Sequence, residues 1–299
     1  MGILKYIEHN YLNPLQSLPV QWYYSAKQTY SALNTEKREH HIVVSLTSFP
    51  ARFPTLHFAI KSILCQTMKP DAIFLCLTKE EVKDKAELPV SLLELEKYGL
   101  QIFFADENLK PHNKYLFAMQ KYPNSFLITV DDDNMYDKYL IAELYSSYLK
   151  HPSAISARRV HKIMNDKSAS ILSYNKWGYE YKKETEPSLG LLATGVGGAL
   201  YPPSLLPDEA FDTAKIRGLC LNADDIWLKF MELKNNVPVV WVKGHRVHPY
   251  TIKHSQKIPL SKNNYHKNHN DRYIAALEEY YGINLASFAS SNYLPLTDK

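Results

Sequence analysis

The chain has 299 residues, a length that fits one large α/β domain or one domain with an appendage. Hydrophobic residues make up 45% and charged residues 22%, which are ordinary proportions for a globular protein. The formal charge of +4 is too small to predict nucleic acid as a partner, and no apolar run approaches the roughly 20 residues that span a bilayer.

The first 40 residues differ from the rest of the chain. They are aromatic and polar, and Pro14 and Pro19 are expected to interrupt any long helix. They also lack the unbroken apolar core of a secretory signal. We therefore expect residues 1–40 to form a helical N-terminal arm that docks on the domain.

A regular alternation of strands and helices starts at His41. Four apolar runs have the length of a buried strand, namely residues 42–46, 72–77, 101–104 and 125–130. Three helical patterns separate them, at residues 53–66, 79–97 and 114–121. This alternation predicts an α/β fold with a mostly parallel central sheet flanked by helices, in which ligands bind beyond the carboxyl ends of the strands.

The second half of the chain is less regular. The elements that we expect there are a helix over 139–150, strands over 154–157 and 237–242, a polar loop or hairpin over 165–190, and a helix from Asp224 to Leu233. A glycine-rich turn from Thr194 to Gly198 runs into a further strand. We expect one catalytic domain over residues 41–250, followed by a basic helical extension over 251–299.

Three consecutive aspartates, Asp131 to Asp133, directly follow the strand that ends at Val130. Carboxylates a few ångströms apart raise one another's pKa unless a cation compensates. Mg²⁺ and Mn²⁺ prefer carboxylate oxygens, and the spacing of Asp131 and Asp133 places both on one side of an extended chain. The triplet therefore favours a divalent-cation site, with helix capping as the alternative.

Five motifs, in this order and at these strand positions, resemble GT-A-type glycosyltransferases, and more narrowly enzymes of bacterial capsule, exopolysaccharide and lipopolysaccharide assembly. The motifs are Ser45-Leu46-Thr47-Ser48-Phe49-Pro50-Ala51-Arg52, His112-Asn113-Lys114-Tyr115, Asp131-Asp132-Asp133, Thr194-Gly195-Val196-Gly197-Gly198 and Asp224-Asp225. The resemblance covers roughly residues 41–250. It implies a Rossmann-like sheet, a nucleotide diphosphate-sugar donor (UDP by default), and Mn²⁺ or Mg²⁺ bridging the donor phosphates.

The resemblance also assigns roles by position. The residues that would contact the donor are Thr47, Ser48, Arg52, Lys114, Asp131, Asp132, Gly197 and Gly198, and those that would bind metal are Asp133, Asp131 and a late histidine, His245 or His248. Structural alternatives stay open. In these alternatives Arg52 pairs with a core carboxylate, and Lys114 is a solvated charge. The glycines form only a tight turn, and each histidine makes hydrogen bonds with nearby protein groups instead of binding metal.

Asp224 and Asp225 open a predicted helix. An inverting sugar transfer needs a base that deprotonates the acceptor hydroxyl. We assign that role to Asp225, with Asp224 as its orienting neighbour. Helix capping is again the alternative.

We therefore expect a metal-dependent transferase that moves a hexose-type sugar to a hydroxyl of a glycan or lipid-linked glycan acceptor. A nucleotidyltransferase or phosphohydrolase would use the same aspartates, but the loop after the first strand, residues 47–52, has no glycine. A noncatalytic carbohydrate- or calcium-binding module would explain the aspartates and the 22 tyrosines, but neither the strand–helix alternation nor Asp224 and Asp225.

The location of the protein is suggested by its cysteines and its basic residues. Three cysteines form neither a disulfide framework nor a zinc spacing, so we expect reduced thiols in a cytoplasmic protein. Between Lys243 and Arg272 lie seven Lys or Arg, five His and one acid. Such a stretch suits phosphate or an anionic membrane surface, and a lipid-linked acceptor would bring the enzyme to the inner face of the cytoplasmic membrane. A solvated basic surface is the alternative.

Overall fold

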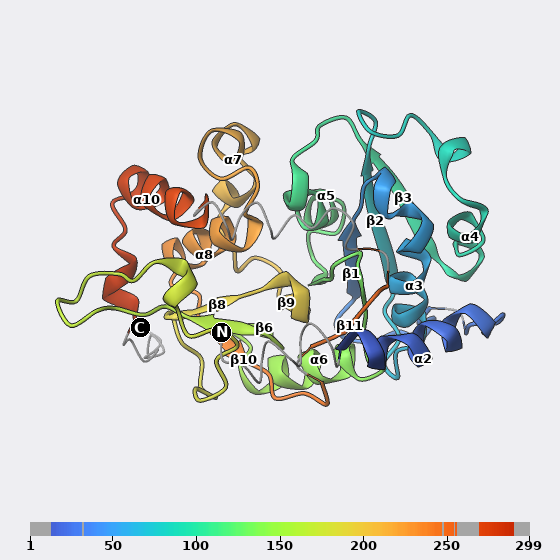
Figure 1. Cartoon of the computed structure of the whole chain (residues 1–299), viewed down its shortest axis with the longest axis horizontal. Helices are drawn as coiled ribbons and strands as arrows, with labels where there is room; N and C mark the ends of the chain where they lie inside the picture. Colours follow the sequence, from blue (N-terminus) through green and yellow to red (C-terminus); the bar gives the residue numbers. More distant parts are fainter. Residues whose placement is uncertain (1–12, 32, 247, 254, 256–268, 290–299) are drawn as a thin grey trace. The chain divides into compact units, whose positions relative to one another are not determined.

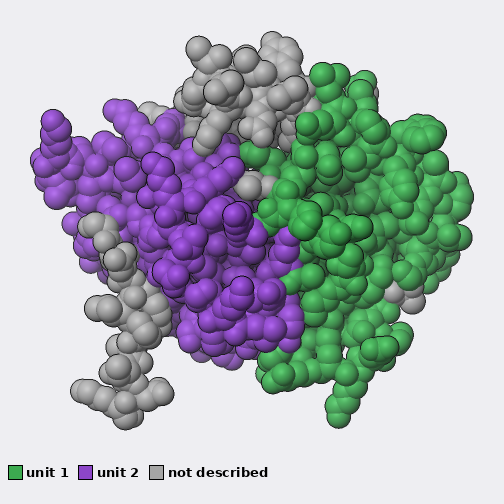
Figure 2. Space-filling model, turned by 90° about the horizontal axis from the view of Figure 1, so that it is seen from below, with its two compact units in different colours: residues 1–108, 113–142, 244–259 green, residues 109–112, 143–243, 260–299 purple. Residues whose placement is uncertain are grey.

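The computed structural model describes residues 13–31, 33–246, 248–253, 255 and 269–289. The chain divides into two compact units (Figure 2). Unit 1 comprises residues 1–108, 113–142 and 244–259, and unit 2 comprises residues 109–112, 143–243 and 260–299. The predicted catalytic domain contributes residues to both units, whereas much of the predicted basic stretch, residues 256–268, lies outside the described residues. Within the described ranges, no helix is long and apolar enough to cross a membrane.

Four parallel strands of unit 1 pair in the order β4-β1-β2-β3. They are β1 (Ile42–Thr47), β2 (Ala72–Thr78), β3 (Leu100–Ala105) and β4 (Phe126–Thr129). Figure 1 labels β1, β2 and β3. Every residue of β2 is buried, as expected of a strand that is covered on both faces. The register pairs Ser45 with Thr129 and Thr47 with Cys76, so the strands end at one common edge.

Helices and a short ribbon complete unit 1. The ribbon pairs β5 (Asn134–Met135) with β11 (Tyr250–Thr251), and the helices include α3 (Phe53–Leu64) and α5 (Leu116–Lys121). The N-terminal arm contains α2 (Asn13–Ala26), which packs on α3 and β11. Pro19 lies inside α2 without interrupting it, contrary to our expectation, because tertiary packing rather than propensity holds this helix.

The predicted helix over residues 79–97 is wrong. The segment forms only a 3-10 turn at Lys85–Glu87, the four-residue α4 (Val90–Leu93) and a second 3-10 turn at Glu96–Tyr98. Pro89 disfavours a helical conformation at the preceding residue, and Leu88 is accordingly extended, with ψ of 146°. The charged residues have helical propensity, but the proline divides them into pieces too short for a longer helix.

In unit 2, β6 (Ile155–Ala157) pairs in parallel with β10 (Val239–Trp241) and antiparallel with β9 (Ala199–Tyr201). A hairpin joins β7 (Val160–Lys162) and β8 (Leu191–Ala193). Its helices are most of α6 (Leu140–Lys150), α7 (Thr213–Leu219), α8 (Asp224–Lys234) and the C-terminal α10 (His269–Tyr281). Across both units, mostly parallel strands flanked by helices confirm the predicted α/β fold class.

Candidate functional site

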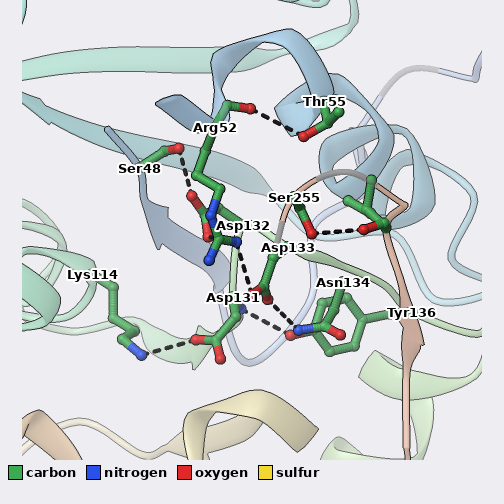
Figure 3. Close-up of polar contacts among 11 residues, drawn as sticks. Ser48, Arg52, Thr55, Lys114, Asp131, Asp132, Asp133, Asn134, Tyr136 and Ser255 are labelled. Atoms are coloured by element: carbon green, nitrogen blue, oxygen red, sulfur yellow. Dashed lines mark hydrogen bonds and ion pairs between the residues drawn. The ribbon is translucent and has the colours of Figure 1, made fainter. Parts of the chain in front are cut away.

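The aspartate triplet lies at the carboxyl end of β4, where the chain leaves the sheet of unit 1 (Figure 3). The Val130 N–H donates to Ser45 O, so pairing with β1 continues up to the triplet. Asp133 leads into β5, and the next helix begins only at Leu140, so the helix-capping alternative is wrong. The triplet therefore occupies the edge at which α/β sheets bind their ligands.

Two basic side chains face the triplet. Lys114 Nζ lies 2.9 Å from Asp131 Oδ1, while Arg52 Nη1 lies 2.8 Å from Asp133 Oδ2 and 3.3 Å from Asp132 Oδ1. The side chains of Arg52 and Lys114 are only 5% and 9% exposed. Lys114 is therefore not the solvated charge of the alternative interpretation, and both predicted donor-binding cations are held against carboxylates in a largely dry environment.

The three carboxylates of the triplet are crowded together, and the charges of Asp133 and Asp131 both act on Asp132. Ser48 Oγ donates to Asp132 Oδ2 at 2.6 Å, which fixes the central carboxylate. Burial, reinforced by the charge of Asp133, nevertheless raises the pKa of Asp132 to about 7, although Arg52 opposes this shift. A further cation would relieve this crowding.

Arg52 also carries an unsatisfied donor. It ends the 3-10 helix Pro50–Arg52, and its guanidinium lies 5.5 Å from the centroid of the Phe49 ring. Its Nε is buried and has no hydrogen-bond partner among the described residues. A buried donor without a partner costs about 1–3 kcal/mol. A ligand oxygen that accepted a hydrogen bond from this N–H would remove that cost. Phosphate oxygens are such acceptors.

The donor chemistry of the triplet fits a hard divalent cation, since all three side chains offer carboxylate oxygens. In the part of the chain that the structure describes, there is no group of three or more His, Cys, Asp or Glu side chains that could hold a metal ion. The contacts of the triplet explain this. Asp131 is turned toward Lys114, and Asp133 toward Arg52. Metal binding by Asp131 and Asp133 therefore stays a prediction.

The other residues predicted in unit 1 make contacts of their own. Thr47 Oγ1 donates to Cys76 O on β2 at 2.9 Å. The ring of His245 packs against Tyr139 at an interplanar angle of 30°, with centroids 4.2 Å apart, and His248 is half-buried in the same segment. Neither histidine belongs to a metal-ligand group among the described residues. Their predicted roles stay predictions.

A second cluster, in unit 2, joins Asp225 to the glycine-rich turn. The Gly195 N–H donates to Asp225 Oδ1 at 3.1 Å. Ala223 is the N-cap of α8 and makes no side-chain capping bond, so neither predicted aspartate occupies the capping position. Asp224 is buried, at 7% exposure, whereas Asp225 is only half-buried. Of the two aspartates, Asp225 is thus the more accessible, as the predicted base must be.

The turn itself is shaped by Arg159. A Cβ atom on Gly197 would lie 2.5 Å from Arg159 Cβ and 2.8 Å from its backbone N, and Gly198 has a φ of 86°. Both positions therefore require glycine for structural reasons. The Arg159 guanidinium donates to Thr194 Oγ1 at 3.0 Å and to Glu180 Oε1 at 3.2 Å. Donor contacts by Gly197 and Gly198 stay predictions.

Sequence reasoning missed two residues that shape these clusters. The hydroxyl of Tyr136, which is buried, accepts the Asp131 N–H at 2.8 Å and so fixes the backbone of the first aspartate of the triplet. Arg159 belongs to a basic pair directly after β6. A charged pair at the end of an apolar strand was a visible signal for Arg159, whereas nothing in the sequence pointed to Tyr136.

Comparisons with known proteins give structural neighbours only. No protein-family model matches the chain, and no curated protein matches it. Similar solved structures include a 4-diphosphocytidyl-2C-methyl-D-erythritol synthase, with 8% identity, a TM-score of 0.44 and coverage of 80% of this chain and 100% of that one. TarS of S. aureus in complex with UDP-GlcNAc has 13% identity, a TM-score of 0.44 and coverage of 81% and 73%.

A mannosyltransferase is also among the similar structures. It is PcManGT from Pyrobaculum calidifontis in complex with GDP-Man and Mn²⁺, with 12% identity, a TM-score of 0.39 and coverage of 98% of this chain and 87% of that one. TM-scores this low carry no argument about function. The function proposed below therefore rests on the side chains of the two clusters.

Proposed function

We propose that the chain is a metal-dependent glycosyltransferase that moves a sugar from a nucleotide diphosphate-sugar to an acceptor hydroxyl. The observation that supports this is the aspartate triplet at the carboxyl end of β4, held together with Arg52 and Lys114. Acidic and basic side chains at one sheet edge suit a ligand that brings both a cation and phosphates.

The residues of the triplet would divide the binding of such a donor. Asp131 and Asp133 would hold Mn²⁺ or Mg²⁺, and the bound ion would neutralise the diphosphate as it leaves the sugar. Arg52, with its unsatisfied buried Nε, and Lys114 would donate to phosphate oxygens. Asp132, fixed by Ser48, would keep the guanidinium of Arg52 in place. UDP as the nucleotide follows from the sequence resemblance.

The second cluster supports the assignment of Asp225 as the base. Its carboxylate is half-buried and accepts the Gly195 N–H, and a fixed orientation is what a general base needs to reach its proton. If Asp225 deprotonates the acceptor hydroxyl and this oxygen attacks the sugar directly, the transfer would invert the configuration of the sugar. The acceptor, a hydroxyl of a bacterial surface glycan, is again taken from the resemblance.

The proposal is tested first by ligand binding. We expect nucleotide-sugars, screened by thermal shift, to raise the melting temperature only when Mn²⁺ is present, because ligand binding stabilises the native state. Asp133→Ala should abolish this Mn²⁺-dependent stabilisation and sugar transfer while the fold stays intact. The matched control is Asp106→Ala. Asp106 follows β3 as the triplet follows β4, but it is 83% exposed and pairs with Lys79 at the surface.

Two results would overturn the proposal. If Asp133→Ala binds donor and Mn²⁺ as the wild type does, the triplet is structural. If the protein instead releases pyrophosphate from a nucleoside triphosphate, or hydrolyses phosphate esters without transferring a sugar, it is a nucleotidyltransferase or a phosphohydrolase. Turnover of a panel of nucleotide-sugars and nucleoside triphosphates, with and without Mn²⁺, separates these activities.

A further inference from the structure

The α2 helix carries an exposed apolar stripe. Leu15, Leu18 and Trp22 are 65%, 40% and 75% exposed. Their spacing of three and then four residues places them on one side of the helix. Large apolar side chains are seldom clustered on a surface without a partner, so the stripe requires an explanation.

The opposite side of α2 fixes the helix to unit 1. Tyr24, 6% exposed, belongs to a core cluster with Phe58 of α3 and Ile252. Gln21 Oε1 accepts the Lys253 N–H at 2.9 Å. In Figure 1, α2 (dark blue) accordingly runs beside α3 and β11. The exposed stripe is thus presented by an anchored helix rather than by a loose terminus.

Several basic residues and one acidic residue, Asp137, lie near α2. The helix itself contains no charged residue. Arg246 donates to Gln16 Oε1 at 2.8 Å, Lys61 Nζ donates to Tyr24 O at 3.0 Å, and the Lys253 side chain is exposed. An anionic surface complements this arrangement, whereas a second copy of the same face would oppose like charges.

A polar cavity of about 230 Å³ adjoins the C-terminal end of α2. Lys27, Lys69, Tyr23 and Tyr30 are among its lining residues. Lys27 Nζ lies 5.6 Å from the ring centroids of both tyrosines. Burial lowers the pKa of Lys69, and the charge of Lys27 adds to this effect, although Cys65 opposes it. Two lysines that line one cavity are suitable partners for a phosphate group.

We propose that this face of unit 1 docks on an anionic phospholipid surface. Leu15, Leu18 and Trp22 enter the boundary between headgroups and acyl chains, while Lys27 and Lys69 receive a headgroup phosphate. Tryptophan favours this boundary, and each Lys or Arg near an anionic leaflet strengthens binding by about five-fold, which corresponds to ~1 kcal/mol. The inference does not depend on the proposed transferase activity.

Tryptophan fluorescence of the full chain gives a direct test. The chain has four tryptophans, and Trp177, Trp227 and Trp241 are at most 9% exposed, so Trp22 alone can respond to lipid. With vesicles of phosphatidylglycerol and phosphatidylethanolamine, we expect a blue shift of the emission and quenching by brominated acyl chains. Trp22→Phe should still bind in co-sedimentation but lose both spectral changes.

Variants then separate the stripe from the charges. The combined change Leu15→Ser, Leu18→Ser and Trp22→Ser should lower vesicle partitioning by at least about ten-fold, because the apolar area is lost. Serine at the exposed Val90 and Leu149 is the matched control and should leave partitioning unchanged. Lys27→Gln with Lys69→Gln should weaken binding to phosphatidylglycerol and reduce its salt dependence.

The proposal is overturned if the wild type does not bind phosphatidylglycerol vesicles at low ionic strength. It is also overturned if the triple serine variant binds vesicles as well as the wild type does. A concentration-dependent dimer that the triple variant abolishes, in the absence of vesicle binding, would assign the stripe to a second copy of the chain instead. Inorganic phosphate that protects Lys27 and Lys69 from acetylation when anionic vesicles do not would count against a lipid headgroup.

Discussion

Asp225 allows a catalytic base to be distinguished from a structural anchor. Its Oδ1 accepts the Gly195 N–H at 3.1 Å, so the carboxylate also holds the glycine-rich turn. Asp225→Asn keeps an acceptor oxygen at this position but removes the group that takes up a proton. Asp225→Ala removes both. The two variants therefore isolate the two roles.

The expected magnitudes differ between them. Alanine leaves the partly buried Gly195 N–H without this partner, which should lower the free energy of unfolding by about 1–3 kcal/mol. Asparagine should lower the free energy of unfolding by only a small part of that amount, because it keeps an acceptor oxygen for the Gly195 N–H. If Asp225 is the base, however, asparagine should reduce kcat by about 10²–10⁴-fold, or roughly 3–5 kcal/mol in activation free energy. Donor affinity should stay within a few-fold, since the loss falls on the transition state.

The assay pairs urea unfolding with steady-state turnover on an authentic acceptor, and Asp224→Asn is the control. Asp224 is buried, at 7% exposure, and should give the milder loss of turnover if it only orients its neighbour. The assignment is falsified if Asp225→Asn retains near-wild-type turnover, in which case Asp225 only anchors the turn. If Asp224→Asn is the inactive variant, the two roles are exchanged.

Two further predictions concern stability. Gly197→Ala should lower the free energy of unfolding by about 1–3 kcal/mol, because the new Cβ would lie 2.5 Å from Arg159 Cβ. Gly218→Ala, whose Cβ would meet nothing within 4 Å in α7, should be neutral or stabilising, and equal losses in urea unfolding would contradict the packing argument. Burial, reinforced by Lys61, lowers the pKa of His57 to about 4, below its ordinary 6.5. Native His57 thus binds fewer protons than unfolded His57, so stability should fall as the pH drops from 6.5 to 4, by about 1–2 kcal/mol after solvent screening. His57→Gln should reduce this loss, and an unchanged pH slope in the variant would refute it.

Most of the sheet was predictable because β1, β2 and β4 are buried on both faces and so form nearly uninterrupted apolar runs. β2 is the clearest example, since all seven of its residues are buried. Propensity alone was a poorer guide. The charged segment 79–97 has helix-forming residues but is divided at Pro89, whereas α2 continues through Pro19 because Tyr24 packs into a core cluster. Pro89, a local signal, decided the first case. Tertiary contacts decided the second, and no local pattern reports them.

The candidate site was predictable to the extent that position along a strand determines it. Asp131 to Asp133 follow β4, and Ser48 follows β1, so parallel strands bring them to one edge. The partner of each side chain was not predictable. Three contacts depend on tertiary geometry: the pairing of Lys114 with Asp131, the bond from the Asp131 N–H to Tyr136, and the packing of the His245 ring against a tyrosine.

Arg52 contacts both Asp132 and Asp133. We therefore predict that replacing Arg52 changes the affinities for metal and for donor in opposite directions. Arg52 Nη1 lies 2.8 Å from Asp133 Oδ2, so without a donor the guanidinium competes with Mn²⁺ for this carboxylate. An adjacent unit charge shifts carboxylate binding equilibria by about ten-fold or more. Arg52→Gln should therefore bind Mn²⁺ alone at least about ten-fold more tightly than the wild type, yet bind UDP more weakly, because a phosphate donor is lost. Calorimetric titrations with Mn²⁺ alone and with UDP measure the two effects, after circular dichroism has shown that the variant is folded. Lys79→Gln, at a surface pair that is 55% exposed, is the control and should change neither affinity. If Arg52→Gln binds Mn²⁺ no better than the wild type, the prediction is wrong and Arg52 does not compete with Mn²⁺. In that case Mn²⁺ either does not bind at Asp133 or binds there without displacing the guanidinium.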